Sequence, residues 1–248
     1  MRSLGPISFP IFLFDGKPGL DESPSRYFSE GPTICLVRAI LFDWDGTIVD
    51  SIRALYETDE AICRRVGVPF DEAIFRRTFS PNWRRMYDAL GIPEDRVDDA
   101  ERVWSETFRA HEMEAFPGVV GAIARLAKAG YQLGIVTGGS RQEVEPQLGR
   151  LGLEKLLTVR VYGHDTPDGK PHPSPLRLAL DMCGPIRPDE AIYVGDALDD
   201  VRMSAAAGVR GVGIVSILAT ADELLAAGAD ETAGSVVEWV NQHLGAGG

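Results

Sequence analysis

Two aspartates, Asp43 and Asp45, follow directly on the apolar run Val37 to Phe42 and are themselves followed by Gly46 and Thr47. A short, almost wholly apolar run is typical of a strand buried on both faces of a sheet. Polar residues at the carboxyl end of such a strand lie where open α/β sheets bind their ligands. Because side chains two positions apart in an extended segment point the same way, we expect Asp43 and Asp45 to face one site, although Gly46 indicates that the backbone bends there.

Two carboxylates this close repel each other, and a bound cation would relieve the repulsion. Mg²⁺ is the usual cation where all the ligands are oxygens and a phosphate lies nearby. Taken alone, the same residues also fit an ordinary strand-end turn rich in Asp and Gly. The choice between these two interpretations depends on what the other predicted strands carry.

Two further apolar runs end in polar residues of complementary types. Leu133–Val136 is followed by Thr-Gly-Gly-Ser at 137–140, and Ala191–Val194 is followed by Gly-Asp-Ala-Leu-Asp-Asp at 195–200, while Lys170 lies between them in Gly-Lys-Pro. The three strand ends supply a carboxylate nucleophile with a neighbouring acid, a hydroxyl with exposed backbone amides, and further carboxylates. With the lysine, these are the groups that phosphoryl transfer through an aspartyl-phosphate requires.

In this order and at these spacings, the four segments resemble the four motifs of the haloacid dehalogenase (HAD) superfamily. The match covers residues 37 to about 215. The resemblance is greatest to the phosphoglycolate phosphatase-like branch, through Phe-Asp-Trp-Asp-Gly-Thr-Ile-Val-Asp-Ser at 42–51 and through Pro-Gly-Val at 117–119 before a predicted helix. It implies an α/β fold, a Rossmann-like and mostly parallel sheet core with an inserted α-helical cap.

The cap is expected at residues 51–115 and the core at 37–50 and 116–248. Apolar spacing and stop signals predict four helices in the cap, at Ile52–Val66 (before Gly67), Ala73–Phe79, Trp83–Leu90 and Val97–Ala115. Residues 116–217 alternate between helix and strand patterns, which predicts right-handed crossovers and a parallel sheet. An apolar stripe near the end of the chain predicts a helix packed on the core; it consists of Val236, Val237, Val240 and Leu244.

Residues 1–36 differ from the rest of the chain. They are rich in Pro and Gly, and their apolar run Ile7–Phe14 is interrupted by Pro10. A secretory signal fits poorly, because only Arg2 is basic and no small-residue cleavage site follows. We expect a poorly ordered N-terminal tail. A misassigned start codon is the alternative, since members of the family commonly begin near the equivalent of Val37.

The resemblance implies a role for each site residue. Asp43 would be the nucleophile, which needs no base because a carboxylate is already ionised at neutral pH. Asp45 would be the general acid that protonates the leaving alkoxide and then activates water. Mg²⁺ would be held by Asp43, by Asp196 and by the backbone carbonyl of Asp45.

The remaining motif residues would bind phosphate or support the others. Thr137 and the Gly138 amide would hold non-bridging phosphate oxygens, and Lys170 would neutralise charge on the nucleophile and the phosphate. Asp200 would lie behind these groups or orient Lys170, with Asp199 as the rival for that position. Thr47 would bond Asp43 or simply stabilise the turn.

Composition sets limits on the partners. A formal charge of −12 disfavours nucleic acid, and no apolar stretch is long enough to span a membrane. Three widely spaced cysteines, Cys35, Cys63 and Cys183, indicate buried thiols of a reducing compartment and not a disulfide framework. We therefore expect a cytoplasmic monomer or homodimer that binds a small phosphorylated metabolite and neither nucleic acid nor membrane.

The predicted function is a Mg²⁺-dependent phosphatase. Dehalogenases lack an acid at the position of Asp45, and phosphonatases use a cap lysine, whereas residues 51–115 contain no lysine. A phosphomutase of the β-phosphoglucomutase type keeps the acid but often has Val at the position of Thr47. A non-catalytic phosphate-binding protein on the same framework would be expected to lose Asp43, Asp45 or Lys170.

The substrate is open at this stage, and phosphoglycolate is suggested by analogy alone. Cap residues that reach over Asp43 would select it. The candidates are Ser80, Asn82, Trp83, Arg84 and Arg85. The two arginines would bind a second anionic group of the substrate, or at least one of them would belong to a solvated helix face.

Overall fold

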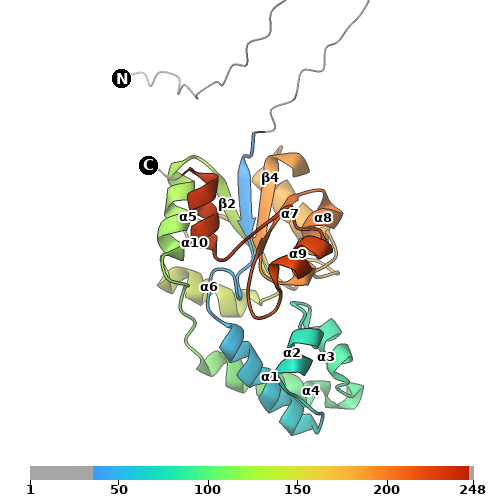
Figure 1. The fold of residues 1–248 in the computed structure, drawn as a ribbon. Helices are drawn as coiled ribbons and strands as arrows, with labels where there is room; N and C mark the ends of the chain where they lie inside the picture. Colours follow the sequence, from blue (N-terminus) through green and yellow to red (C-terminus); the bar gives the residue numbers. More distant parts are fainter. Residues whose placement is uncertain (1–35, 246–248) are drawn as a thin grey trace, which may run out of the picture. The chain divides into compact units, whose positions relative to one another are not determined.

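A computed structural model describes residues 36–245 of the chain (Figure 1). The tail predicted at residues 1–36 lies outside the described residues, apart from Leu36. The described residues form a six-stranded sheet in which every pair of neighbours is parallel, in the order β3-β2-β1-β4-β5-β6. The strands are β1 (Ala39–Phe42), β2 (Gln132–Val136), β3 (Val159–Val161), β4 (Ala191–Gly195), β5 (Arg210–Ile214) and β6 (Glu231–Ala233). The predicted α/β fold with a parallel sheet is thereby confirmed.

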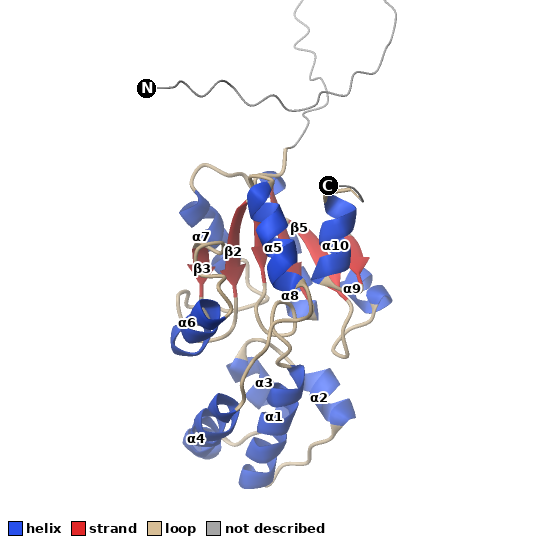
Figure 2. Cartoon of the chain, turned by 90° about the vertical axis from the view of Figure 1, so that its left-hand side faces the viewer, coloured by secondary structure: helices blue, strands red, loops and turns tan. Residues whose placement is uncertain are grey.

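Helices cover both faces of the sheet, because alternate residues of the central strand point to opposite sides. Ile40 and Phe42 pack in one apolar cluster with residues of α5 (Val119–Lys128), α6 (Arg141–Arg150) and α10 (Val236–His243). The opposite face of β1 packs in a second cluster with α7 (Ser174–Cys183) and α8 (Leu198–Ala207). Figure 2 shows α5 and α10 together on one side of the sheet. A further helix, α9 (Ala221–Ala227), packs against α8.

Residues 51–115, called the helical insertion below, connect β1 to α5. Four α-helices and two short 3-10 turns make it up, and it has an apolar cluster of its own that includes Ile62, Met86 and Leu90. Its elements are α1 (Ile52–Val66), α2 (Glu72–Thr78), α3 (Trp83–Leu90), η1 (Glu94–Arg96), α4 (Val97–Thr107) and η2 (Phe108–Ala110). The first three helices agree with the predicted ranges to within a residue.

The fourth predicted helix was wrong at its end, because α4 ends at Thr107 and the chain does not remain helical to Ala115. The reason is a pairing that the periodicity of the sequence does not reveal. The Asp50 amide donates to the Glu114 carbonyl (2.9 Å), and the Phe116 amide donates to the Ile48 carbonyl (3.0 Å). The segment before α5 must be extended to form these bonds, so the two connections of the helical insertion run side by side.

Asp59 of α1 is a buried acid inside the helical insertion. Its side chain is fully buried, and neither carboxylate oxygen has a hydrogen-bond partner among the described residues. Burial raises the pKa of Asp59 well above its usual value. A carboxyl group whose pKa is higher in the folded than in the unfolded state lowers the free energy of unfolding at every pH above the unfolded-state pKa. This loss of stability increases with pH until the pH reaches the folded-state pKa.

We expect Asp59→Asn to raise the free energy of unfolding, with a gain of about 1–2 kcal/mol near pH 8 and a smaller gain near pH 5. The amide cannot ionise in the unfolded state, so the substitution removes the part of the cost that grows with pH. Urea unfolding at both pH values measures the difference. Asp88→Asn, which changes an exposed aspartate of α3, is the matched control and should change the free energy of unfolding by less than about 0.5 kcal/mol. A gain from Asp59→Asn that is the same at both pH values would contradict this account.

Candidate active site

The sheet brings the predicted site residues to one edge. β1 lies between β2 and β4, with Phe42 opposite both Ile135 and Val194. Residues that follow these strands therefore emerge side by side at the carboxyl edge, where open α/β sheets bind ligands. The Asp43 amide continues the ladder by donating to the Val194 carbonyl (2.8 Å), and the Thr137 amide donates to the Val161 carbonyl (3.0 Å).

Lys170 connects two of the carboxylates. Its Nζ donates to Asp43 Oδ1 (2.5 Å) and to Asp200 Oδ1 (2.7 Å), and all three side chains are buried. Asp200 is held by two more donors, the Ala197 amide on Oδ2 (3.0 Å) and the Tyr193 hydroxyl on Oδ1 (3.0 Å). The structure therefore puts Asp200, and not Asp199, in the position that orients the lysine.

The charges of this group are unbalanced. Burial and the charge of Asp200 raise the pKa of Asp43 well above its usual value, and the opposing effect of Lys170 is smaller. Burial lowers the pKa of Lys170, but Asp200 and Asp43 together raise it more, so the ammonium stays charged. Burial, and then Asp200, raise the pKa of Asp196 to about 7. The excess of buried negative charge is what a divalent cation would balance.

The residues present fit a hard cation such as Mg²⁺. Carboxylate oxygens of Asp43, Asp196 and Asp200 lie within 4.8 Å of one another. Asp196 Oδ2 is buried and has no hydrogen-bond partner among the described residues. A Cβ atom on Gly46 would lie only 2.5 Å from that oxygen, so the glycine leaves room beside it. The donor set consists of oxygens alone, which suits Mg²⁺.

Asp200 completes the group of three carboxylates beside Asp43 and Asp196. One sequence-based expectation differs from the structure: Thr47 neither bonds Asp43 nor acts only within the turn, because its hydroxyl donates to Asp196 Oδ1 (3.2 Å). The chain leaves the extended conformation at Gly46, whose φ is 76°. The predicted metal contact through the Asp45 carbonyl stays a prediction.

Asp45 instead points toward the loop after β2. Its Oδ2 lies 3.4 Å from the position that a Cβ on Gly139 would occupy. Burial raises the pKa of Asp45 to about 6, and the charge of Glu143 adds to the shift. A carboxyl group that exchanges its proton near neutral pH is suited to general acid–base catalysis.

A cavity of about 140 Å³ adjoins these groups. Its wall combines the loops of the sheet with the start of α3. Thr137, Gly138 and Lys170 line it, as the sequence predicts for substrate-binding residues, and the lysine links it to Asp43. From the helical insertion the wall takes Pro81, Asn82, Trp83 and Arg84.

The two arginines predicted as substrate contacts differ in position. Arg84 lies in the cavity wall and stacks its guanidinium over the Trp83 ring at 5.0 Å. Arg85 points toward Asp199, with Nη1 3.8 Å from Oδ2, and is therefore directed away from the cavity residues. Ser80 also bonds Asp199 (2.8 Å).

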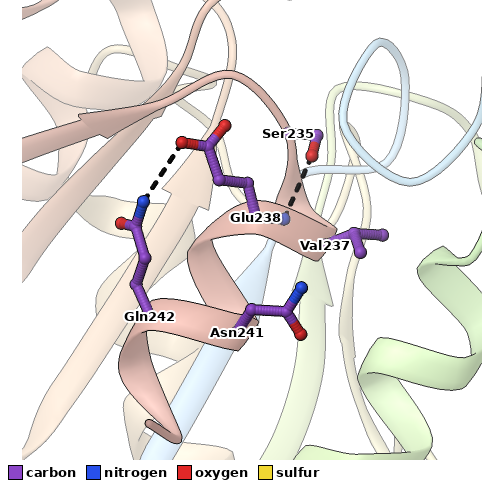
Figure 3. A pocket seen from close by; sticks show the side chains of 5 residues that line it. All are labelled: Ser235, Val237, Glu238, Asn241 and Gln242. Atoms are coloured by element: carbon purple, nitrogen blue, oxygen red, sulfur yellow. Dashed lines mark hydrogen bonds between the residues drawn. The ribbon is translucent and has the colours of Figure 1, made fainter. Parts of the chain in front are cut away.

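A second depression, of about 390 Å³, lies along α10 (Figure 3). It is lined by Ser235, Val237, Glu238, Asn241 and Gln242. The Gln242 side-chain amide donates to Glu238 Oε1 (3.1 Å), and the Glu238 backbone amide donates to Ser235 Oγ (3.1 Å). It contains no residue of the carboxylate group, so it is not a candidate active site.

Sequence reasoning missed two residues of the site. Tyr193 shares its hydroxyl between the Val136 carbonyl (2.8 Å) and Asp200, and the charge of Glu143 raises the pKa of Asp45. Tyr193 gave a signal, because a tyrosine within an apolar strand needs a partner for its hydroxyl. Ser80 was a predicted candidate, but its bond to Asp199, like the effect of Glu143, depends on how distant segments pack.

Comparison with known proteins identifies the class. Residues 40–214 match the family model described as haloacid dehalogenase-like hydrolase. The phosphoglycolate phosphatase of Nitrosococcus oceani is 32% identical over 69% of this chain and 80% of the relative. The phosphorylated carbohydrates phosphatase of Thermotoga maritima is 28% identical over 78% of this chain and 92% of the relative. The crystal structure of CbbY from Rhodobacter sphaeroides in complex with phosphate superposes with a TM-score of 0.69 at 25% identity, covering 82% of this chain and 96% of that chain.

The chain belongs to the haloacid dehalogenase-like hydrolase family. It is an enzyme of that family, and its matched curated relatives are phosphatases. Within residues 36–245, none of the helices combines the length and the apolar character that crossing a bilayer would need.

We expect Gly46→Ala to weaken Mg²⁺ binding at least tenfold, because the new Cβ would displace the unpartnered Asp196 oxygen. Gly67→Ala is a matched control: Gly67 has a similar φ (81° against 76°), but nothing lies within 4 Å of its Cβ position. Both substitutions should cost about 1–2 kcal/mol of stability from the left-handed backbone. Isothermal titration with Mg²⁺ should show at least a tenfold loss of affinity for Gly46→Ala only. Equal affinities in the two variants would rule out the proposed place of the metal.

Proposed function

We propose that this enzyme is a Mg²⁺-dependent phosphatase that hydrolyses a small phosphorylated metabolite through an aspartyl-phosphate on Asp43. The observation that carries the proposal is Lys170, buried between Asp43 and Asp200 in the wall of a cavity of about 140 Å³. A buried lysine among carboxylates, beside a carboxylate oxygen with no partner, is an arrangement that stabilises an anionic phosphoryl group. The phosphatase names of the curated relatives support the same reading.

In the first step the ester is cleaved. Lys170 engages Asp43 Oδ1, which leaves Oδ2 to attack phosphorus. The new Oδ2–P bond forms as the bond from phosphorus to the ester oxygen breaks. Asp45 gives its proton to the departing alkoxide, and its raised pKa keeps the acid form available near neutral pH.

The second step regenerates the enzyme. Asp45, now ionised, takes a proton from one water molecule, whose oxygen attacks phosphorus. The Asp43–phosphorus bond breaks, inorganic phosphate leaves, and Asp43 returns to its carboxylate form. Thr137 and the Gly138 amide, both in the cavity wall, hold non-bridging oxygens through the two steps.

The metal would be held by Asp43, Asp196 and the backbone carbonyl of Asp45. Asp200 would lie beside these ligands. Bound Mg²⁺ supplies positive charge that lowers the repulsion between phosphate and carboxylates. Thr47 fixes Asp196 by bonding Oδ1, which leaves Oδ2 directed to the ion.

Within this proposal the helical insertion acts as a cap and residues 37–50 and 116–248 act as the catalytic core. The cavity is formed by the cap and the core together, because Asn82, Trp83 and Arg84 line it from the cap and the sheet loops line it from the core. Its volume suits a small metabolite, and Arg84 offers charge for a second anionic group; phosphoglycolate meets both conditions. The enzyme would act in the cytoplasm as a monomer or homodimer.

A panel of phosphorylated metabolites, including phosphoglycolate and sugar phosphates, tests the proposal by measured release of inorganic phosphate. We expect release with Mg²⁺, its loss in EDTA and its return when Mg²⁺ is restored. Full activity in metal-free buffer would contradict the metal assignment. Conversion of a hexose 1-phosphate to its 6-phosphate, with little free phosphate, would identify a mutase in place of a phosphatase.

We expect Asp43→Asn to lower turnover below a hundredth of the wild-type value, because the amide cannot form the acyl phosphate. Lys170 keeps its bond to Asp200 in this variant, so the fold should persist, as circular dichroism would show. Asp50→Asn changes an exposed acid of the same segment and should retain at least half of the activity. Retention of a tenth of wild-type turnover by Asp43→Asn would exclude the aspartyl-phosphate mechanism.

We expect Asp45→Asn to slow alkyl phosphates more than p-nitrophenyl phosphate, because the phenolate needs less protonation as it leaves. A general acid contributes about 10²–10⁴-fold, so alkyl esters should lose at least a hundredfold in kcat/KM. In the wild type, kcat/KM for alkyl esters should fall as pH rises above about 6, where Asp45 loses its proton. Equal losses for both ester classes would show that Asp45 does not protonate the leaving group.

A further inference from the structure

Asp199 links the catalytic loop to the helical insertion. It lies in the first turn of α8, between Asp196 and Asp200 in sequence, and its side chain is only 6% exposed. Its Oδ2 accepts a 2.8 Å bond from the hydroxyl of Ser80, which is itself buried just before α3. Its Oδ1 is paired with Arg202 of the same helix at 3.2 Å.

The segment Ser80–Asn82 is seated among three loops of the core. Besides the bond to Asp199, the Pro81 carbonyl lies so near Gly138 that a Cβ there would be 2.2 Å from the oxygen. The Asn82 side-chain amide lies 3.3 Å from the Cβ position of Gly169, next to the catalytic lysine. The strongest polar contact in this set is the bond from Ser80 to Asp199.

We propose that the Ser80–Asp199 hydrogen bond is the latch that holds the helical insertion closed over the phosphate site, and that Asp199 is a positioning residue for the reaction. The proposal rests on the proposed function only in that closure of the helical insertion is expected to affect catalysis. The latch itself is a property of the chain and can be measured without substrate.

Its burial sets this bond apart from other polar contacts between the helical insertion and the core, such as the part-buried bond from Trp104 Nε1 to Glu143 Oε1 (3.3 Å). Arg76 and Glu223 also join the two parts, at 3.4 Å, but both side chains are largely exposed. Exposed ion pairs contribute little to stability, whereas a buried bond to a carboxylate is stronger and costs more to leave unmade. The Ser80 bond must break, and water must reach Asp199, before the helical insertion can open.

The geometry also provides for reversible opening. Arg85 Nη1 lies 3.8 Å from Asp199 Oδ2, beyond hydrogen-bond range, and half of its side chain is exposed. Its long side chain can follow the carboxylate when Ser80 departs, while Arg202 stays in place. Because Asp199 lies in the same turn as Asp200 and three residues after Asp196, closure is coupled to the loop that holds the metal and lysine partners.

The test combines hydrogen exchange with kinetics on Ser80→Ala, Asp199→Ala, the double variant and Arg76→Ala as the matched control. In the ligand-free proteins, mass spectrometry should show at least tenfold faster amide exchange in residues 79–86 for both single latch variants. Both single variants lack the Ser80–Asp199 bond, so the double variant should exchange no faster than the faster of the two. Asp199→Ala also loses the pairing with Arg202 (3.2 Å), and Ser80→Ala also removes the acceptor of the Asn82 amide (3.2 Å). Arg76→Ala should stay within twofold of the wild type. Ser80→Ala removes one buried hydrogen bond, so it should lower the melting temperature by only a few degrees and leave the protein folded.

On the preferred substrate, we expect kcat/KM to fall about tenfold in each latch variant and no further in the double variant. Unchanged exchange in residues 79–86, or single effects that multiply in the double variant, would overturn the latch. If the wild type releases no phosphate from any member of the panel, the proposed function fails, and the exchange data alone decide the latch.

Discussion

The concentration of buried negative charge at one sheet edge is the constraint on which the rest of the structure depends. Oxygens of Asp43, Asp196 and Asp200 lie within 4.8 Å of one another, and Lys170 is the one buried cation among the described residues. Such a group is unfavourable unless each charge is paired or bonded. The lysine, the Tyr193 hydroxyl and the first turn of α8 meet part of that need, and they can do so because three parallel strands end at the same level.

The helical insertion adds what the sheet cannot supply. The sheet edge alone would leave the carboxylates open to water, which weakens every electrostatic interaction there. Residues at the start of α3 cover the edge and turn it into a cavity. The cover has its own apolar cluster, and Leu55, Phe75 and Phe108 also pack in the cluster that contains Phe42 and Trp44. In the proposed function the sheet edge carries the chemistry and the helical insertion selects the substrate.

Local patterns predicted much of the structure. Apolar runs placed β1, β2 and β4, and helical spacing gave Ile52–Val66 and Trp83–Leu90 with their exact bounds, because these features depend on neighbours in sequence. The predicted phosphate-binding residues lie together because the carboxyl ends of these parallel strands meet at one edge of the sheet.

What the sequence could not predict depends on distant contacts or on single torsion angles. The end of α4 is set by pairing of the following segment with residues 48–50, and the nearness of Asp45 to Gly139 depends on how the loops after β1 and β2 meet. The partner of Asp199 lies 119 positions away in the chain. Helical spacing does put Asp59 on the buried face of α1, because Leu55, Ile62 and Cys63 lie three or four positions from it. That its carboxylate would have no partner could not be predicted, because partners come from distant segments.

The paired connections of the helical insertion carry a consequence of another kind. Since residues 48–50 and 114–116 are hydrogen-bonded neighbours, the helical insertion enters and leaves the core at one point. The two boundaries of this segment in the sequence therefore meet at one place in the structure, so the segment can be exchanged, enlarged or deleted without altering the register of any strand.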